Sequence, residues 1–120
     1  MNKNSLNFKL EDALYNKYII NLKFNEGLLI TATNITHFPK IVYTGLFYLN
    51  DLKNRYKFFR IYDSIIEAYN DLYSLIIQNA FAITSFKNMI SLCIKKQIGF
   101  QNDIIFPLKE ENANINEIVF

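Results

Sequence analysis

The sequence predicts one α+β domain, built from an antiparallel β-sheet or sandwich of about six or seven strands with a helical hairpin inserted between the fourth and fifth strands. Apolar residues alternate with period two in the first and last thirds of the chain, and the period changes to helical between residues 49 and 79. Successive strands have short links, which favours antiparallel pairing. With 120 residues, 51% of them hydrophobic, the chain is long enough for one core. We assign the domain to residues 1–109 and a polar tail or linker to 110–120.

The first three strands are predicted from alternation and turn residues. Residues 6–10 alternate between apolar and polar side chains, and residues 11–16 then have the composition of a turn. Two β-type runs, 18–24 and 28–35, are separated by a short segment that ends in Gly27. This arrangement predicts a β-hairpin in which Gly27 supplies a positive φ angle.

A fourth strand and a first helix follow. Pro39 cannot donate a hydrogen bond to a strand ladder, so it predicts a loop before the β-branched and aromatic run 41–48. Asn50 or Asp51 can then cap a helix. The apolar face of that helix has spacings of three, four and three residues, at Leu49, Leu52, Tyr56 and Phe59.

A second helix is predicted after a break near residues 60–63. Ser64 and Glu67 have the spacing of a capping box, which favours two helices over one long helix. Asp63, Glu67 and Asp71 are expected to face water. The opposite, buried stripe is expected to contain Ile65, Tyr69, Leu72 and Ile76.

The last third of the chain returns to period two. It predicts strands at 81–86, 90–94 and 104–108, with turns at Lys87–Asn88 and at Gly99. The strongest periodic segments together predict a buried core. Its members are Ile20, Leu22, Ile30, Ile65, Tyr69, Leu72, Ile90, Leu92, Ile94 and Phe106.

The chemistry-bearing residues are few. His37 and Cys93 are the single histidine and cysteine, and no phosphate-binding or nucleophile motif built on glycine occurs. We therefore predict no enzyme activity, cofactor, metal or small-molecule ligand. The longest uncharged run, 72–86, has 15 residues, fewer than the ~20 that a membrane span needs. The first twelve residues lack the apolar core of a signal peptide, so we expect a cytoplasmic protein without membrane contact, and a nuclear location stays open.

Charge is distributed unevenly around a net value of +2. Residues 1–60 carry 9 basic and 4 acidic side chains, and residues 61–120 carry 4 basic and 7 acidic ones. Lys53, Arg55, Lys57 and Arg60 lie among aromatic residues, a pattern also found in nucleic-acid-binding surfaces. Four cations beside an acidic stripe form a weak binding surface, so we expect a solvated helix flank and consider nucleic acid an unlikely partner.

The large aromatic content points to protein contacts. The chain holds 11 Phe and 8 Tyr, and exposed aromatic side chains favour protein interfaces. Phe100 follows Gly99 at the expected tip of the last hairpin, among polar neighbours. We predict Phe100 as a protein-interface residue; the alternative is that its ring folds back over the edge of the sheet.

The order of elements, four strands, a helical hairpin and three strands, resembles the head domain of centriolar cartwheel proteins and end-joining DNA-repair scaffolds. The resemblance covers residues 6–109 at the level of topology. It implies a head that precedes a dimerising coiled coil and pairs through an apolar residue of the last hairpin, the position of Phe100. The runs Tyr48–Leu52 and Phe58–Ile65 are also similar to segments of AT-rich protist proteins.

The sequence therefore predicts a non-enzymatic protein–protein interaction module, with a self-associating head of a coiled-coil scaffold protein as its specific form. The expected partner is a protein, which includes a weak homo-oligomer. Two other functions stay open. One is a small inhibitor or immunity-type protein that blocks a partner by surface contact, and the other is a weak nucleic-acid-binding module.

Overall fold

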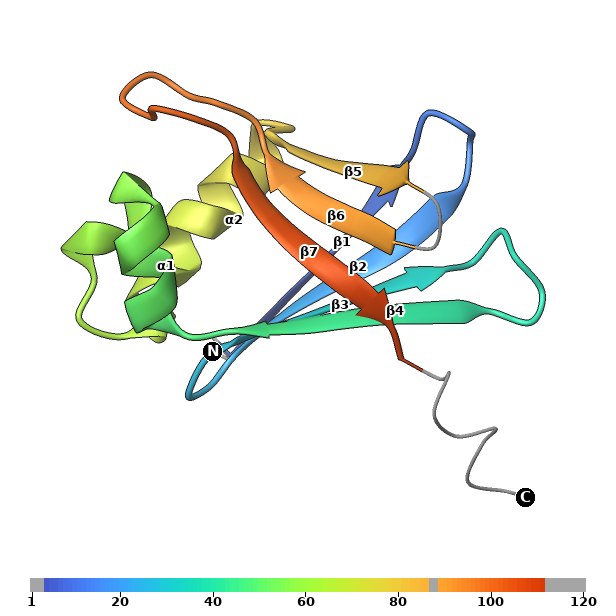
Figure 1. The fold of residues 1–120 in the computed structure, drawn as a ribbon, viewed down its shortest axis with the longest axis horizontal. Coiled ribbons are helices and arrows are strands. Elements are labelled where there is room, and N and C mark those ends of the chain that lie inside the picture. Colours follow the sequence, from blue (N-terminus) through green and yellow to red (C-terminus); the bar gives the residue numbers. More distant parts are fainter. Residues whose placement is uncertain (1–3, 87–88, 112–120) are drawn as a thin grey trace.

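A computed structural model describes residues 4–86 and 89–111 and confirms an α+β fold with an antiparallel sheet (Figure 1). The helical segments lie between the fourth and fifth strands, as predicted. The predicted turn at Lys87–Asn88 and most of the predicted tail fall outside the described residues. The strands are β1 (Ser5–Glu11), β2 (Lys17–Phe24), β3 (Leu28–Asn34), β4 (Ile41–Phe47), β5 (Phe81–Phe86), β6 (Met89–Ile94) and β7 (Ile104–Glu110).

The seven strands form one curled sheet in the order β1-β2-β3-β4-β7-β6-β5. Every neighbouring pair is antiparallel, and β7 joins the last three strands to the first four by pairing with β4. The curl brings the two edge strands together, since the rings of Phe8 in β1 and Phe81 in β5 have centroids 5.0 Å apart. The fold is thus one nearly closed sheet, and a sandwich of two separate sheets is not confirmed.

The helical segments cover one end of the curled sheet (Figure 1). Phe59 packs edge-on against Phe106 of β7, with ring centroids 6.4 Å apart, and Tyr69 packs against Phe24 of β2 at 5.4 Å. These contacts close the core at that end. The segments are α1 (Leu49–Arg55), the 3₁₀ helices η1 (Lys57–Ile61) and η2 (Ile65–Ala68), and α2 (Tyr69–Ile77).

The first helix is shorter than the sequence predicts. It ends at Arg55 because Tyr56 adopts an extended backbone, with φ −129° and ψ 123°. From this conformation the Tyr56 hydroxyl reaches the backbone of Ile105. The predicted caps Asn50 and Asp51 were wrong: both lie inside the helix, and Tyr48 precedes it without a side-chain cap bond.

The predicted capping box forms only in part. The Glu67 carboxylate reaches back and accepts a hydrogen bond from the backbone N–H of Asp63 at 3.2 Å. It also lies 3.4 Å from the Ser64 hydroxyl, which itself makes no cap bond to the helix backbone. The segment opens as the 3₁₀ helix η2 before α2 begins, and 3₁₀ turns are frequent at the N-termini of α-helices.

The hairpin at Gly27 is confirmed, but the reason predicted for its glycine was wrong. Gly99 has a positive φ angle of 93°, whereas Gly27 does not. A Cβ atom at residue 27 would lie 3.0 Å from the carbonyl oxygen of Phe47 and 3.1 Å from the ring of Tyr48. Glycine is needed there because β4 passes close to the β2–β3 turn.

The β1–β2 turn is organised by a buried carboxylate. Asp12 accepts hydrogen bonds from the backbone N–H groups of Leu14 and Asn16, both at 2.9 Å. The hydroxyl of Tyr18 donates to the same side chain at 3.3 Å. These bonds hold Tyr15 in the left-handed region, with φ 67°.

The predicted core is confirmed except at one position. Nine of its ten members are buried, and Tyr69 is partly buried at the edge of the cluster. Strand β7 continues to Glu110, one residue beyond the predicted domain boundary, and the Glu111 N–H still bonds to the carbonyl of Val42. The largest side chains shielded completely at the centre are Phe59 and Phe106.

Truncation of the core helix should destabilise the fold strongly. Leu72 of α2 is buried among the core side chains, so Leu72→Ala should lower the free energy of unfolding by about 2–5 kcal/mol. Ser74→Ala, on the exposed side of the same helix, should change it by less than about 0.5 kcal/mol. Urea unfolding of both variants measures the difference, and equal losses would contradict the assigned facing of α2.

Alkaline pH should destabilise the protein through Tyr18. Burial raises the pKa of Tyr18 from 10.0 to about 12, and the neighbouring Asp12 carboxylate adds to this rise. The unfolded chain therefore releases this proton at lower pH than the folded chain does, so stability should fall from pH 10 towards pH 12. Tyr18→Phe should reduce this slope. Burial also raises the pKa of Tyr62, so part of the slope should remain.

The matched control for this measurement is Tyr15→Phe, because Tyr15 is largely exposed. It should leave the pH dependence of the free energy of unfolding unchanged. An unchanged slope in Tyr18→Phe would instead show that this phenol does not couple folding to pH.

Candidate protein-interaction surface

The connection between β6 and β7 forms an ordered apex. The Phe100 N–H donates to the Gln97 carbonyl at 3.0 Å, which together with the positive φ of Gly99 fits a type II turn. At the base of the loop, the Lys96 N–H donates to the Asp103 carboxylate at 2.6 Å. Turn and base bonds together hold the apex in one shape.

Phe100, the predicted interface residue, lies on the inner side of this apex. Its ring is partly buried and packs on Phe58 of η1, with centroids 5.4 Å apart. Phe58 in turn packs edge-on against the fully buried Phe59 at 5.0 Å. The Phe100 ring therefore links the apex to the core, and its role in an interface stays a prediction.

Ile98 is the side chain that the apex presents to water, and the sequence analysis missed it. Its relative exposure of 104% is the highest among the exposed large apolar residues of the described chain. In the turn Gln97–Phe100 it holds the second position, directly before the glycine with positive φ. The Ile-Gly pair was the available signal, because in a type II turn glycine takes the third position and the second residue lies at the outermost corner.

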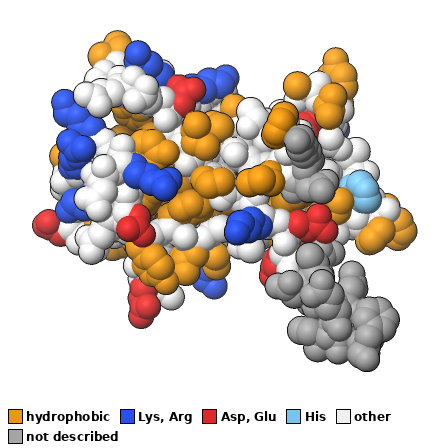
Figure 2. Space-filling model, viewed as in Figure 1, with side chains coloured by type: hydrophobic (Ala, Val, Ile, Leu, Met, Phe, Trp, Pro, Cys, Tyr) orange, Lys and Arg blue, Asp and Glu red, His pale blue; other side chains and the backbone are white. Residues whose placement is uncertain are grey.

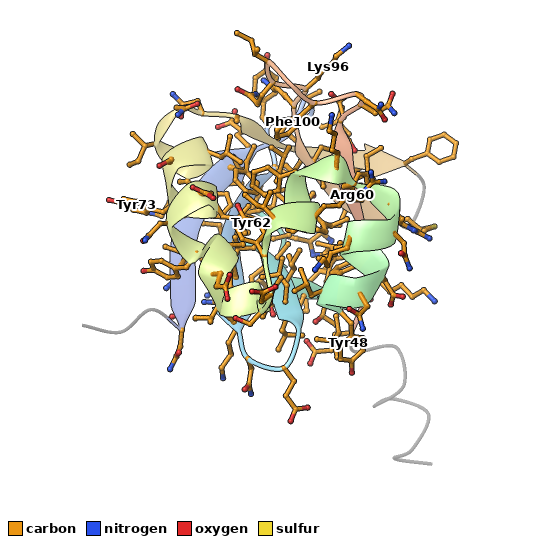
Figure 3. All side chains as sticks on the ribbon, turned by 90° about the vertical axis from the view of Figure 1, so that its left-hand side faces the viewer. Tyr48, Arg60, Tyr62, Tyr73, Lys96 and Phe100 are labelled. Atoms are coloured by element: carbon orange, nitrogen blue, oxygen red, sulfur yellow. The ribbon has the colours of Figure 1, made fainter. Side chains whose placement is uncertain are left out.

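Basic side chains lie on the apex and beside it, and Lys96 is labelled in Figure 3. Lys95 and Lys96 lie at its base, and Lys57 and Arg55 belong to the adjacent helical segment. Within residues 4–86 and 89–111, no carboxylate forms an ion pair with these four cations. Figure 2 shows Lys and Arg side chains gathered at this end of the molecule.

Two of the cations that were predicted to be solvated also donate hydrogen bonds to backbone carbonyls. Lys53 is only partly exposed and its Nζ donates to the Tyr62 carbonyl at 2.7 Å, while the Nε of exposed Arg60 donates to the Lys53 carbonyl at 3.1 Å. Both bonds tie α1 to the residues that follow it. Lys57, the third predicted cation, is exposed.

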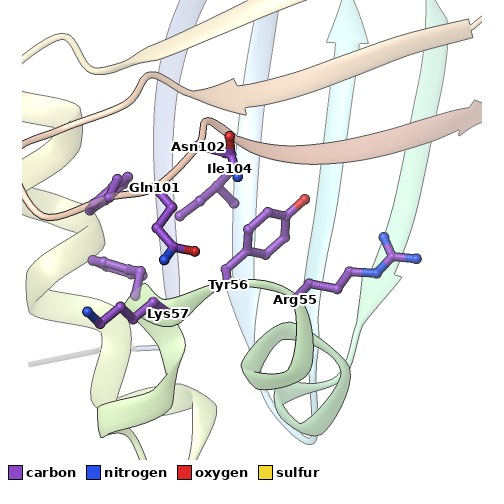
Figure 4. Close-up of a pocket in the computed structure, with 8 residues that line it drawn as sticks. Arg55, Tyr56, Lys57, Gln101, Asn102 and Ile104 are labelled. Carbon is purple, nitrogen blue, oxygen red and sulfur yellow. The ribbon is translucent and has the colours of Figure 1, made fainter.

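A small hollow of about 30 Å³ separates the apex from the helical segment (Figure 4). Tyr56 and Gln101 border it, whereas Arg55 and Lys57 lead away from it on opposite sides. The volume is far below the ~300 Å³ at which ligand pockets begin. The hollow is therefore a small packing gap between the apex and the helical segment, and not a ligand pocket.

The remaining reactive residues have structural surroundings. Cys93 is half-buried in β6, and burial raises the pKa of its thiol, which keeps the weakly nucleophilic protonated form. His37 lies in the exposed β3–β4 loop, with Nδ1 3.0 Å from the Pro39 carbonyl oxygen. The Tyr62 hydroxyl, directly after η1, donates a hydrogen bond to the Asp71 carboxylate of α2. Within the described ranges, no three His, Cys, Asp or Glu residues are grouped so that they could hold a metal ion.

Comparisons with family models, with curated proteins and with solved structures found no match to this chain. The described residues include no helix of the length and apolar character required to cross a bilayer.

The hydroxyl of Tyr56 should contribute measurably to stability. It accepts from the Ile105 N–H and donates to the Ile105 carbonyl, both at 3.2 Å, so Tyr56→Phe should cost about 1–2 kcal/mol of unfolding free energy. Tyr73→Phe, on the half-exposed Tyr73 of α2, should cost less than about 0.5 kcal/mol. Amide exchange at Ile105 should accelerate in the first variant only, and an unchanged rate there would contradict the pairing.

Proposed function

We propose that this chain is a non-enzymatic protein–protein interaction module that contacts its partner through the β6–β7 apex. The observation that carries the proposal is Ile98, a large apolar side chain held fully in water by an ordered turn. Covering such a side chain removes apolar surface from water, and full burial of an Ile contributes roughly 1.5–3 kcal/mol. The aromatic contact between Phe100 and Phe58 supports the apex from below.

A second copy of the chain is the partner that the surface favours. A hollow of about 360 Å³ lies beside α1 and the β2–β3 turn, with the apolar side chains of Leu49 and Ile65 in its lining and the carboxylates of Glu26 and Asp63 around it. Those charges complement Lys95 and Lys96 beside Ile98. A contact made by one apolar side chain and a small hollow supports only weak pairing. In small interfaces the favourable free energy of contact barely exceeds the entropic cost of association.

This proposal keeps the specific form suggested by topology, a self-associating head domain of a scaffold protein. Nucleic-acid binding by the basic segment 53–60 is less well supported, because two of its four cations, Lys53 and Arg60, donate to backbone carbonyls. A protein that blocks a different partner would use the same apex, and would differ by staying monomeric.

Replacing the apex side chain should abolish association and leave the fold intact. Ile98→Glu changes a fully exposed position, so its thermal midpoint should stay within about 2 °C of the original while concentration-dependent association disappears. Phe38→Glu is the matched control, because Phe38 is 94% exposed in the β3–β4 loop rather than at the apex. Sedimentation equilibrium up to millimolar protein makes the comparison.

Phe100→Glu separates the two apex positions in the same experiment. Its ring packs on Phe58, so this change should lower stability as well as association. If the original chain stays monomeric at all concentrations, self-association is excluded. That result would favour the alternative of an inhibitor that blocks a different partner. If Phe38→Glu abolishes association and Ile98→Glu does not, the contact surface lies at the other end of the sheet.

A further inference from the structure

The seam between β4 and β7 opens into a groove on the outer face of the sheet. The two strands pair only at Tyr43 with Glu110 and at Thr44 with Lys109, although both continue further. Beyond these pairs, the opening has a volume of about 590 Å³. Strand residues Leu46, Ile105 and Pro107 line one part, and α1 forms the opposite wall. Figure 2 shows apolar side chains gathered over this region.

Pro107 explains why the ladder stops. The Glu111 N–H bonds to the Val42 carbonyl, so hydrogen-bonded pairs fall at every second residue, with Thr44 and Lys109 next. The following pair would be Leu46 with Pro107. Proline has no N–H to donate, and the ladder ends one step earlier. Pairing of β7 with β6 is unaffected, because the backbone groups of residue 107 point away from β6.

The β7 side of the groove is protected against strand addition. The outward N–H and C=O of Ile105 are both bonded to the Tyr56 hydroxyl, which substitutes for a neighbouring strand. Pro107 presents only a carbonyl. Proline and side-chain plugs are common protections of sheet edges.

The β4 side of the same groove has no such protection. By the alternation of the ladder, the N–H and C=O of Leu46 face the groove, and in the described chain neither has a partner on β7. The Leu46 side chain is 50% exposed and that of Ile105 is 45% exposed. Backbone groups of both kinds thus lie beside apolar side chains on an accessible surface.

We propose that this groove binds a short extended segment of a partner protein, which adds to the free edge of β4. The segment would exchange two backbone hydrogen bonds with Leu46, and its next N–H would face the Pro107 carbonyl. Apolar side chains at alternate positions would cover Leu46 and Ile105, as in other strand-addition sites. Beneath the groove, Phe47 and Phe106 are already packed together at 5.1 Å, so the segment binds on the outer face only.

The chemistry of the groove selects an extended apolar peptide over other occupants. Asp51 and Arg55 on the α1 wall balance each other in charge, so the groove does not favour a strongly charged ligand. The unpaired backbone groups on this edge are those of Leu46, because the Tyr48 carbonyl accepts from the Leu52 N–H at 3.1 Å. The open stretch from Leu46 to Tyr48 is about 7–10 Å long at 3.3 Å per residue. A segment of four or five residues spans it. This site is separate from the apex, and its test is independent of Ile98.

The test uses a capped pentapeptide of alternating Val and Thr, titrated into the 120-residue chain and followed by amide chemical shifts. We expect saturable shifts centred on Leu46, Tyr56 and Ile105. N-methylation of the peptide at the residue opposite Leu46 removes a donor and should weaken binding at least tenfold, since one hydrogen bond of about 1.4 kcal/mol corresponds to that factor.

Two variants locate the site. Pro107→Val restores an N–H opposite Leu46, allows the ladder to continue and should reduce binding at least tenfold, whereas Thr31→Val on the outer face of β3 should not. Absence of binding at millimolar peptide, or equal binding of the N-methylated peptide, would overturn the proposal. If Pro107→Val instead abolishes self-association of the protein, the groove is a contact between copies and the peptide assignment is wrong.

Discussion

The structure depends on a continuous set of aromatic contacts centred on Phe106. Its ring packs edge-on against Phe47 of β4 at 5.1 Å and against Phe59 of η1 at 6.4 Å, so one side chain joins β7, β4 and the helical insert. From Phe59 the contacts continue through Phe58 to Phe100 at the apex. The same packing that closes the core therefore also fixes the surface on which Ile98 is displayed.

The seam between β4 and β7 is a second consequence of this packing. Phe47 and Leu108 fill the inner side so completely that a Cβ atom at Gly45 would lie 2.8 Å from the Phe47 ring and 2.9 Å from Leu108. The interior beneath the seam is therefore closed although the backbone ladder is not. Pro107 interrupts hydrogen bonding without opening the core, and the resulting groove is confined to the outer surface.

The sequence predicted what depends on local periodicity and missed what depends on distant pairing. Strands β1 to β7 and most of the core follow from alternation, because one face of each strand is buried. The single curled sheet does not, since the β4–β7 junction consists of two residue pairs far apart in sequence. The end of α1 at Arg55 is likewise set by the bond between Tyr56 and Ile105. At the apex, the choice between Phe100 and Ile98 depends on turn geometry, and Pro107 inside a predicted strand was an unused sign of an open edge.

The placement of polar side chains fits the proposed interaction module. Asp12 and Asn34 are buried and accept from backbone N–H groups in turns, Asp103 accepts from Lys96 at the base of the apex, and Asp71 accepts from Tyr62. These four side chains stabilise two turns, the base of the apex and the contact of Tyr62 with α2. The described surface also presents an apolar side chain on a fixed turn, cations beside it that pair with no described carboxylate, and a strand edge without a partner on β7. Apolar surface and unpaired backbone groups gain free energy by being covered by another chain, as the proposed function requires.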